Sequence, residues 1–227
     1  MTSNEVYSII LYAAAKNKQN GYISPDDFNN VLMPVAQRSY LDYLLGEYQK
    51  YQIRRPISIV EFGQNERVRQ SISPLIYGTV LNVYANGTVG FPSDYEYIDA
   101  MWSVYGSYNV RFIQQDRQDD YLHSEIDPIV TNPVYLINHE GFQFFPDRPY
   151  GENQAKMSYV RTPPSIIWGY DYDSNNRPVW NPMKSQEPVW GDTDMMNIIV
   201  RALALVGVNL QLNVVIGYSN EIKNGGA

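Results

Sequence analysis

This 227-residue chain contains two histidines, and histidine is the side chain whose ordinary pKa lies near neutrality. His123 and His139 lie in different segments, and neither neighbours a serine or a carboxylate in a recognised catalytic motif. The chain has no cysteine, which excludes a thiol nucleophile, a thiolate metal site and a disulfide. It also has no glycine-lysine-serine or glycine-lysine-threonine triplet of the kind that binds phosphate. We therefore expect no enzyme activity, no catalytic residue and no bound cofactor.

The densest group of ionisable side chains lies between residues 116 and 127. Carboxylates in such a group can bind a hard cation such as Ca²⁺. A run of charges in a loop is more often a solvated turn, and we expect no metal site here. The group consists of Asp116, Asp119, Asp120, His123, Glu125 and Asp127.

Two other segments resemble the start of a calcium-binding loop but lack its ligands. Residues 16–27 contain the central glycine as Gly21, whereas lysines occupy the first and third ligand positions. In residues 171–182, Asp171 and Asp173 have the right spacing, but Asn176 stands where the glycine is needed. We interpret the first segment as a connector between helices and expect metal binding at neither.

Five aromatic residues near the C-terminal end suggest a sugar-binding platform, because aromatic faces stack on the apolar faces of sugars. Aromatic packing in a β-core or at a contact between subunits explains them equally well. A carbohydrate-binding module or a hydrolase therefore stays an alternative function. The five residues are Trp168, Tyr170, Tyr172, Trp180 and Trp190.

The composition favours protein contacts over nucleic-acid binding. A formal net charge of −7 opposes the contacts to many phosphates that give affinity for nucleic acid. The 20 tyrosines favour interfaces with other proteins, because tyrosine is amphipathic and enriched there. The N-terminus lacks a basic region followed by an apolar stretch, and no apolar run is long enough to span a bilayer. We expect a soluble protein that is made in the cytoplasm and does not enter a membrane.

Residues 4–49 have the apolar period of an α-helical hairpin. The second helix should begin at Ser24, which can cap it, with Pro25 at the first helical position. Pro34 should disturb this helix, because proline has no backbone N–H, and Gly46 should end it.

From about residue 54 the pattern changes to the short alternating segments of antiparallel β-structure. Asn86-Gly87 predicts a hairpin between residues 80–85 and 88–91. A second hairpin should join residues 134–137 to 142–145, and further strands are expected at 157–161 and 165–172. Residues 172–190 are rich in Asn, Pro and Ser and predict an extended arm or a long loop, which in compact domains is usually functional.

A helix should run from the acidic cap at residues 192–194 to Gly207. Asn197 and Arg201 are its polar interior residues, so we expect it to be covered on all sides, by its own domain or by a neighbouring copy. Residues 210–222 fit either a last helix or a strand, and the end of the chain should be frayed.

These patterns predict an α+β fold in three parts. Residues 1–53 should form an N-terminal helical hairpin, and residues 54–188 an antiparallel β-rich middle with the arm 172–190. Residues 189–227 should form a C-terminal segment whose buried helix packs with the rest.

The order of these segments resembles that of virion structural proteins from tailed phages of Bacteroidetes, including crAss-like phages. The similar residues at the start are Glu5-Val6-Tyr7 and the run from Asn20 to Asn29. In the second half they are Tyr159 to Pro164, Trp168-Gly169-Tyr170, Ser185 to Trp190, and the capped helix ending in Gly207-Val208-Asn209-Leu210. The similarity covers both ends and the second half of the chain.

This resemblance implies a head-tail connector, or ring protein, in the neck below the portal. Such proteins form cyclic rings, commonly twelve-fold, around the channel through which DNA leaves, and they have no catalytic residues. The expected partners are further copies of the chain, the portal protein and neighbouring neck or tail proteins, and DNA passes without specific binding. The expected location is the virion, and another virion or tail assembly component is the alternative. Each copy of a ring needs two different contact patches, for which the candidate residues are Trp180, Trp190, Met196, Ile199 and Leu203.

Overall fold

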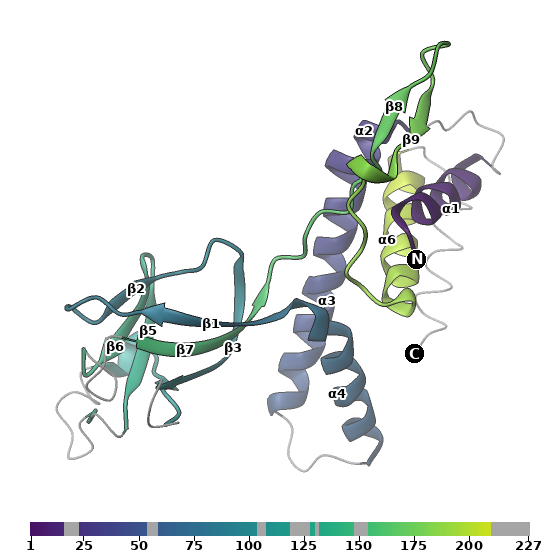
Figure 1. The fold of residues 1–227 in the computed structure, drawn as a ribbon. Helices are drawn as coiled ribbons and strands as arrows, with labels where there is room; N and C mark the ends of the chain where they lie inside the picture. The colour runs from purple at the N-terminus through teal and green to yellow at the C-terminus, as the bar shows by residue number, and fades with distance from the viewer. Residues whose placement is uncertain are drawn as a thin grey trace. The chain divides into compact units, whose positions relative to one another are not determined.

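The computed structural model describes residues 1–15, 23–53, 59–103, 108–118, 128–129, 132–147 and 154–209. The chain divides into two compact units: unit 1 comprises Met1–Pro74 and Pro163–Ala227, and unit 2 comprises Leu75–Thr162. The fold is α+β, as the sequence predicts, with an N-terminal helix, a β-rich middle and a C-terminal helix (Figure 1). The three predicted parts do not coincide with these units, because residues 163–188 group with the helices of unit 1.

Unit 1 consists mainly of helices, and its N-terminal part confirms the helix start predicted at Ser24. The Ser24 hydroxyl accepts a hydrogen bond from the Asp27 backbone N–H, so serine caps the second helical segment. Just before Pro34 lies a π-helical turn, in which the Met33 N–H donates to the Phe28 carbonyl. The helices are α1 (Ser3–Ala15), α2 (Pro25–Asp27), η1 (Phe28–Leu32), α3 (Met33–Ile53), α4 (Ile59–Ile72) and α6 (Asp192–Asn209).

Two boundaries that the sequence predicted in this unit were wrong. Gly46 does not end its helix, and α3 continues to Ile53, because a single glycine inside a helix costs only about 1 kcal/mol. The β region does not begin at residue 54, because Ile59–Ile72 forms helix α4, which packs against α3. None of the described helices combines the length and the apolarity that a membrane crossing requires.

The cover of α6 comes mainly from within its own unit, where it packs against α3 and α1. Its buried face repeats at helical spacing and consists of Met195, Ile198, Ile199, Ala202, Leu203 and Val206. The prediction that no face meets water was wrong, since Met196 is 50% exposed. The helix starts at Asp192 as predicted and passes Gly207 to end at Asn209. Residues 210–227 lie outside the described residues, as does the greater part of the acidic group at 116–127.

The described residues of unit 2 form two sheets. The first is antiparallel in the order β1-β7-β3, and the second has the order β2-β6-β5-β4, in which β4 runs parallel to β5 (Figure 1). The strands are β1 (Ile76–Asn82), β2 (Thr88–Gly90), β3 (Tyr95–Ser103), β4 (Arg111–Phe112), β5 (Val134–Asn138), β6 (Gly141–Phe145) and β7 (Gln154–Arg161).

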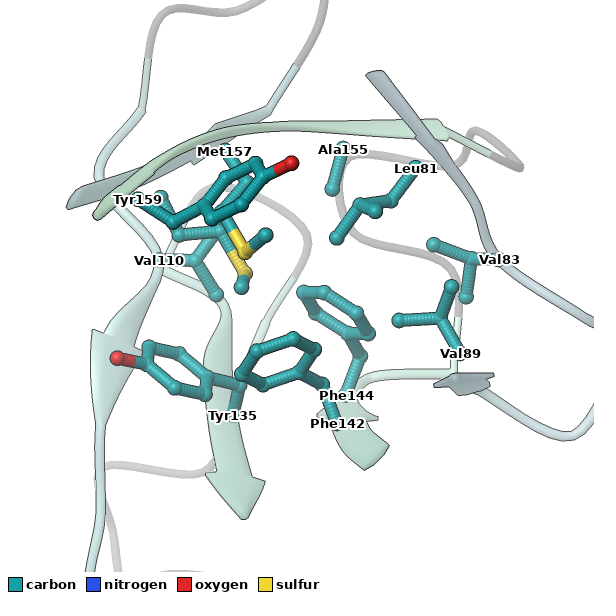
Figure 2. Close-up of a cluster of buried hydrophobic side chains, with 11 residues drawn as sticks. Leu81, Val83, Val89, Val110, Tyr135, Phe142, Phe144, Ala155, Met157 and Tyr159 are labelled. Atoms are coloured by element: carbon teal, nitrogen blue, oxygen red, sulfur yellow. The ribbon is translucent and has the colours of Figure 1, made fainter. Parts of the chain in front are cut away.

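The core of unit 2 joins side chains from both sheets. Phe142 and Phe144 of β6 extend toward Ala155, Met157 and Tyr159 of β7 (Figure 2). Burying one such aromatic or aliphatic side chain contributes about 1.5–3 kcal/mol, so this cluster provides much of the stability of the unit. The cluster also contains Leu81, Val83, Val89, Met101, Val110 and Tyr135.

The second predicted hairpin is confirmed, and the first is only partly right. Strands β5 and β6 pair antiparallel across the turn between Asn138 and Gly141. The turn at Asn86-Gly87 forms, with the Gly87 N–H bonded to the Tyr84 carbonyl at 2.9 Å and with a φ of 77° at Gly87. The flanking strands do not pair with each other, because β1 joins β7 and β2 joins β6. The chain changes sheets at this turn, which places side chains from both of its sides in one core.

Candidate assembly surface

The strand predicted at residues 165–172 is limited to Tyr170–Tyr172, and the arm predicted at 172–190 is not loose. Strands β8 (Tyr170–Tyr172) and β9 (Pro178–Trp180) form a short antiparallel hairpin, and the 3-10 turn η5 (Pro182–Lys184) follows it. Within unit 1 the hairpin extends beyond the end of the helices (Figure 1).

The tip of the hairpin is a closed turn. The Asp173 carboxylate accepts hydrogen bonds from the backbone N–H groups of Asn175 and Arg177, both at 2.8 Å. Asn176 adopts a left-handed backbone with a φ of 58°, which asparagine tolerates better than most residues. The spacing that resembled a calcium loop therefore serves a turn, in which the carboxylate is already satisfied by backbone N–H groups.

Four residues from the helices of unit 1 hold the base of the hairpin. The Asn29 amide receives a hydrogen bond from the Trp168 backbone N–H at 2.7 Å and donates one to the Trp168 carbonyl at 3.1 Å. The Trp168 indole N–H donates to Asn4 at 3.0 Å, and its ring packs on Tyr7 at a centroid distance of 4.4 Å. The Tyr170 hydroxyl donates to Asp26 at 2.9 Å. The hairpin is thus fixed to α1 and to the start of the second helical segment.

The turn η5 is fixed to the hairpin by a polar network. The Ser185 hydroxyl oxygen accepts from the Trp180 indole N–H and from the Gly169 backbone N–H, both at 3.0 Å. Asp171 forms an ion pair with Lys184 and accepts from the Asn181 amide. Hydrogen bonds from Lys184 and Asn181 lower the pKa of Asp171. Residues 170–185 therefore act as one ordered body rather than as an extended arm.

This body, which we call the apolar hairpin (residues 170–185), carries exposed apolar side chains. In the antiparallel register Tyr172 and Trp180 belong to one face, and Val179 belongs to the other. The exposed fractions are 61% for Tyr172, 52% for Val179, 36% for Trp180 and 91% for Met183 of η5. An ordered projection with apolar residues on both faces suits insertion into a groove of another protein.

The five predicted interface residues do not form one surface. Trp190, Ile199 and Leu203 are at most 7% exposed and belong to the interior of unit 1, so assigning them to a contact between copies was wrong. Trp190 packs edge-on against Tyr40 with a centroid distance of 5.4 Å. Trp180 and Met196 are exposed and stay candidates. The sequence analysis did not include Val179 and Met183 among the candidates for an exposed apolar surface. Both could have been noticed as apolar residues inside a polar, proline-rich segment.

The five aromatic residues of the predicted sugar platform do not form one exposed surface either. Trp168 and Trp190 are buried, which leaves Tyr172 and Trp180 as the well-exposed members. Tyr170 stacks on Trp168 at a centroid distance of 5.7 Å, so its ring completes the packing at the base of the hairpin.

The ionisable groups around α6 stabilise the fold. The Asp194 carboxylate accepts from the Tyr40 hydroxyl at 2.6 Å and from the Ser71 hydroxyl at 2.8 Å. Burial, and then the hydrogen bond to Asp194, raise the pKa of Tyr40. The Arg201 guanidinium lies over the rings of Tyr40 and Tyr43, at 4.9 and 5.1 Å, and burial lowers its pKa.

A cavity of about 580 Å³ lies beside this network, lined by residues of α4 and of the start of α6. Its lining includes Glu66, Arg67 and Asp194, the last already bound to two hydroxyls. Neither histidine lines this cavity among the described residues. His139 is exposed and belongs to unit 2, and His123 lies outside the described residues. Within the described ranges, no three histidines or carboxylates lie close enough together to hold a metal ion.

The chain matches no protein-family model and no curated protein.

Proposed function

We propose that this chain is a structural virion protein of a tailed phage and that copies of it form a ring in the head-tail connector below the portal. The observation that carries the proposal is the apolar hairpin, which is anchored at its base and exposes Val179 and Met183. A ring needs one projecting patch and one receiving patch on each copy, and the hairpin provides the projecting one. The resemblance of the segment order to connector proteins supports the same role.

The charge of the chain supports a location beside DNA that does not bind it. A net charge of −7 repels phosphates, so DNA can pass through a channel lined by this protein without being held. In this proposal the chain is not an enzyme, and its partners are other copies, the portal protein and the adjacent neck or tail proteins. Another virion assembly component is the alternative, because the same hairpin suits a different virion partner. A carbohydrate-binding module is less well supported, because Trp168 and Trp190 are buried.

Negative-stain imaging and light scattering of the purified protein, alone and with its portal, test the proposal. We expect rings for the natural chain and loss of rings when Val179→Asp and Met183→Asp are combined, because charges would enter the contact. Both side chains are exposed, so the variant should keep its fold and melting temperature. The matched control combines Val179→Ile with Met183→Leu and should still form rings. A natural chain that stays monomeric at all concentrations, with and without the portal, would refute the proposal.

A further inference from the structure

A second exposed apolar surface lies on the helical segment that holds the base of the hairpin. Val31 of η1 is 57% exposed and Val35 of α3 is 45% exposed, and the two lie one helical turn apart. Pro34 lies beside them and is half-buried. Valine is one of the weaker helix formers, so helix formation gives no reason for two valines on an exposed face. We call Val31, Pro34 and Val35 the valine stripe.

The valine stripe and the apolar hairpin lie on nearly opposite sides of this helical segment. Asn29, which binds the Trp168 backbone at the base of the hairpin, precedes Val31 by two helical positions. Two positions correspond to about 200° around an α-helix. The hairpin of a copy does not cover its own stripe, since Val31 and Val35 are both exposed. Two different patches on opposite sides of one subunit are what a head-to-tail contact requires.

Each patch carries a charge beside its apolar residues, and the two charges are opposite. On the hairpin, Arg177 lies two positions before Val179, which places both on one face about 7 Å apart. On the helix, Asp27 lies four positions before Val31, which is one turn or about 6 Å. Both charged residues are exposed, and the Arg177 guanidinium has no ion pair with any described residue. The two patches therefore match in apolar character, in charge and in spacing.

We infer that the apolar hairpin of one copy docks on the valine stripe of the next, with Val179 against Val31 and Arg177 beside Asp27. Local charge complementarity is the reason for choosing the hairpin of a second copy as the occupant. The net charge of −7 on each copy opposes association only weakly, because exposed charges are largely screened beyond about 8 Å at physiological ionic strength. The inference rests on the self-assembly in the proposed function, and it identifies the receiving patch.

Chemical crosslinking of introduced cysteines tests this contact, because the natural chain has none. The test protein carries Val31→Cys and Val179→Cys, both at exposed positions, and is assembled, treated with a short bismaleimide and analysed on a denaturing gel. We expect a ladder of covalent multimers, because each copy would be linked to two neighbours. The matched control combines Val179→Cys with Ser8→Cys, at an exposed position of α1, and should give no ladder. Assembled test protein that gives no ladder, or an equal ladder in the control, would overturn the inference.

Arg177→Glu tests the charge pair, because it would place two carboxylates together at the contact. We expect this variant to need at least tenfold more protein than the natural chain to form rings, and Arg177→Lys to stay within about twofold of it. An Arg177→Glu variant that assembles as readily as the natural chain would overturn the pairing with Asp27. Rings that form without the ladder would overturn this inference and leave the ring proposal intact, whereas a natural chain that never assembles would overturn both.

Discussion

Asn29 and Trp168 lie 139 positions apart and are joined by two hydrogen bonds, in which the asparagine amide pairs with the tryptophan backbone as a neighbouring strand would. This pairing links the second helical segment to the residue that lies just before the apolar hairpin. The position of the hairpin therefore depends on a residue that is distant in sequence.

Replacing Asn29 with alanine should destabilise unit 1 by about 1–3 kcal/mol, because the partly buried Trp168 N–H and carbonyl lose their partner. Urea unfolding followed by tryptophan fluorescence measures the change. Asn30→Ala is the matched control, because Asn30 is exposed and should change stability by less than about 0.5 kcal/mol. Equal stabilities of the two variants would show that the pairing contributes nothing.

Leu203→Asp should unfold unit 1, because the leucine is 7% exposed and a charge would enter the packing of α6. We expect loss of helical circular dichroism or recovery only from inclusion bodies. Met196→Asp on the same helix should fold, since Met196 is 50% exposed. A soluble, fully helical Leu203→Asp protein would contradict the burial of this face.

Gly141 should tolerate no other residue. Its φ is 148°, and a Cβ would fall on the carbonyl oxygen of Val89 in the neighbouring strand β2. Gly141→Ala should therefore destabilise unit 2 by about 2 kcal/mol or more, as measured by thermal unfolding. Gly90→Ala in the same pair of strands is the control, because the nearest atom to its Cβ would be 3.9 Å away. A normal melting temperature for Gly141→Ala would show that this strand pairing is wrong.

Alkaline pH should weaken unit 2 through Tyr159. Burial, and then its hydrogen bond to Asp94 at 2.8 Å, raise the pKa of Tyr159 to about 12, from an ordinary value of 10.0. Because the folded pKa is the higher one, this contribution to stability is complete below pH 10 and is lost as the pH rises from 10 toward 12.

Tyr159→Phe tests this contribution by urea unfolding at several pH values. The variant should be less stable by about 1 kcal/mol at pH 7, and its stability should fall less steeply than that of the natural chain above pH 10. Parallel pH curves for the two proteins would exclude Tyr159 as the cause.

Local patterns in the sequence predicted those elements that depend on a few neighbouring residues. Ser24-Pro25 specified a helix start, Asp192 to Asp194 another, and Asn138 to Gly141 a hairpin between two apolar strands. Each depends on a cap, a dipole or a turn that is complete within about ten residues, so no distant contact was needed to predict it.

The tertiary structure alone decided which elements meet. The turn at Asn86-Gly87 was predictable, but its strands join different sheets because the shared core requires apolar residues from both sides of the turn. The same holds for α6, whose apolar face is covered by α3 and α1, and for Trp190, which lies against Tyr40. Burial depends on which surfaces pack together over long sequence distances, so a pattern of apolar residues shows that a side chain needs cover but not which part of the chain provides it.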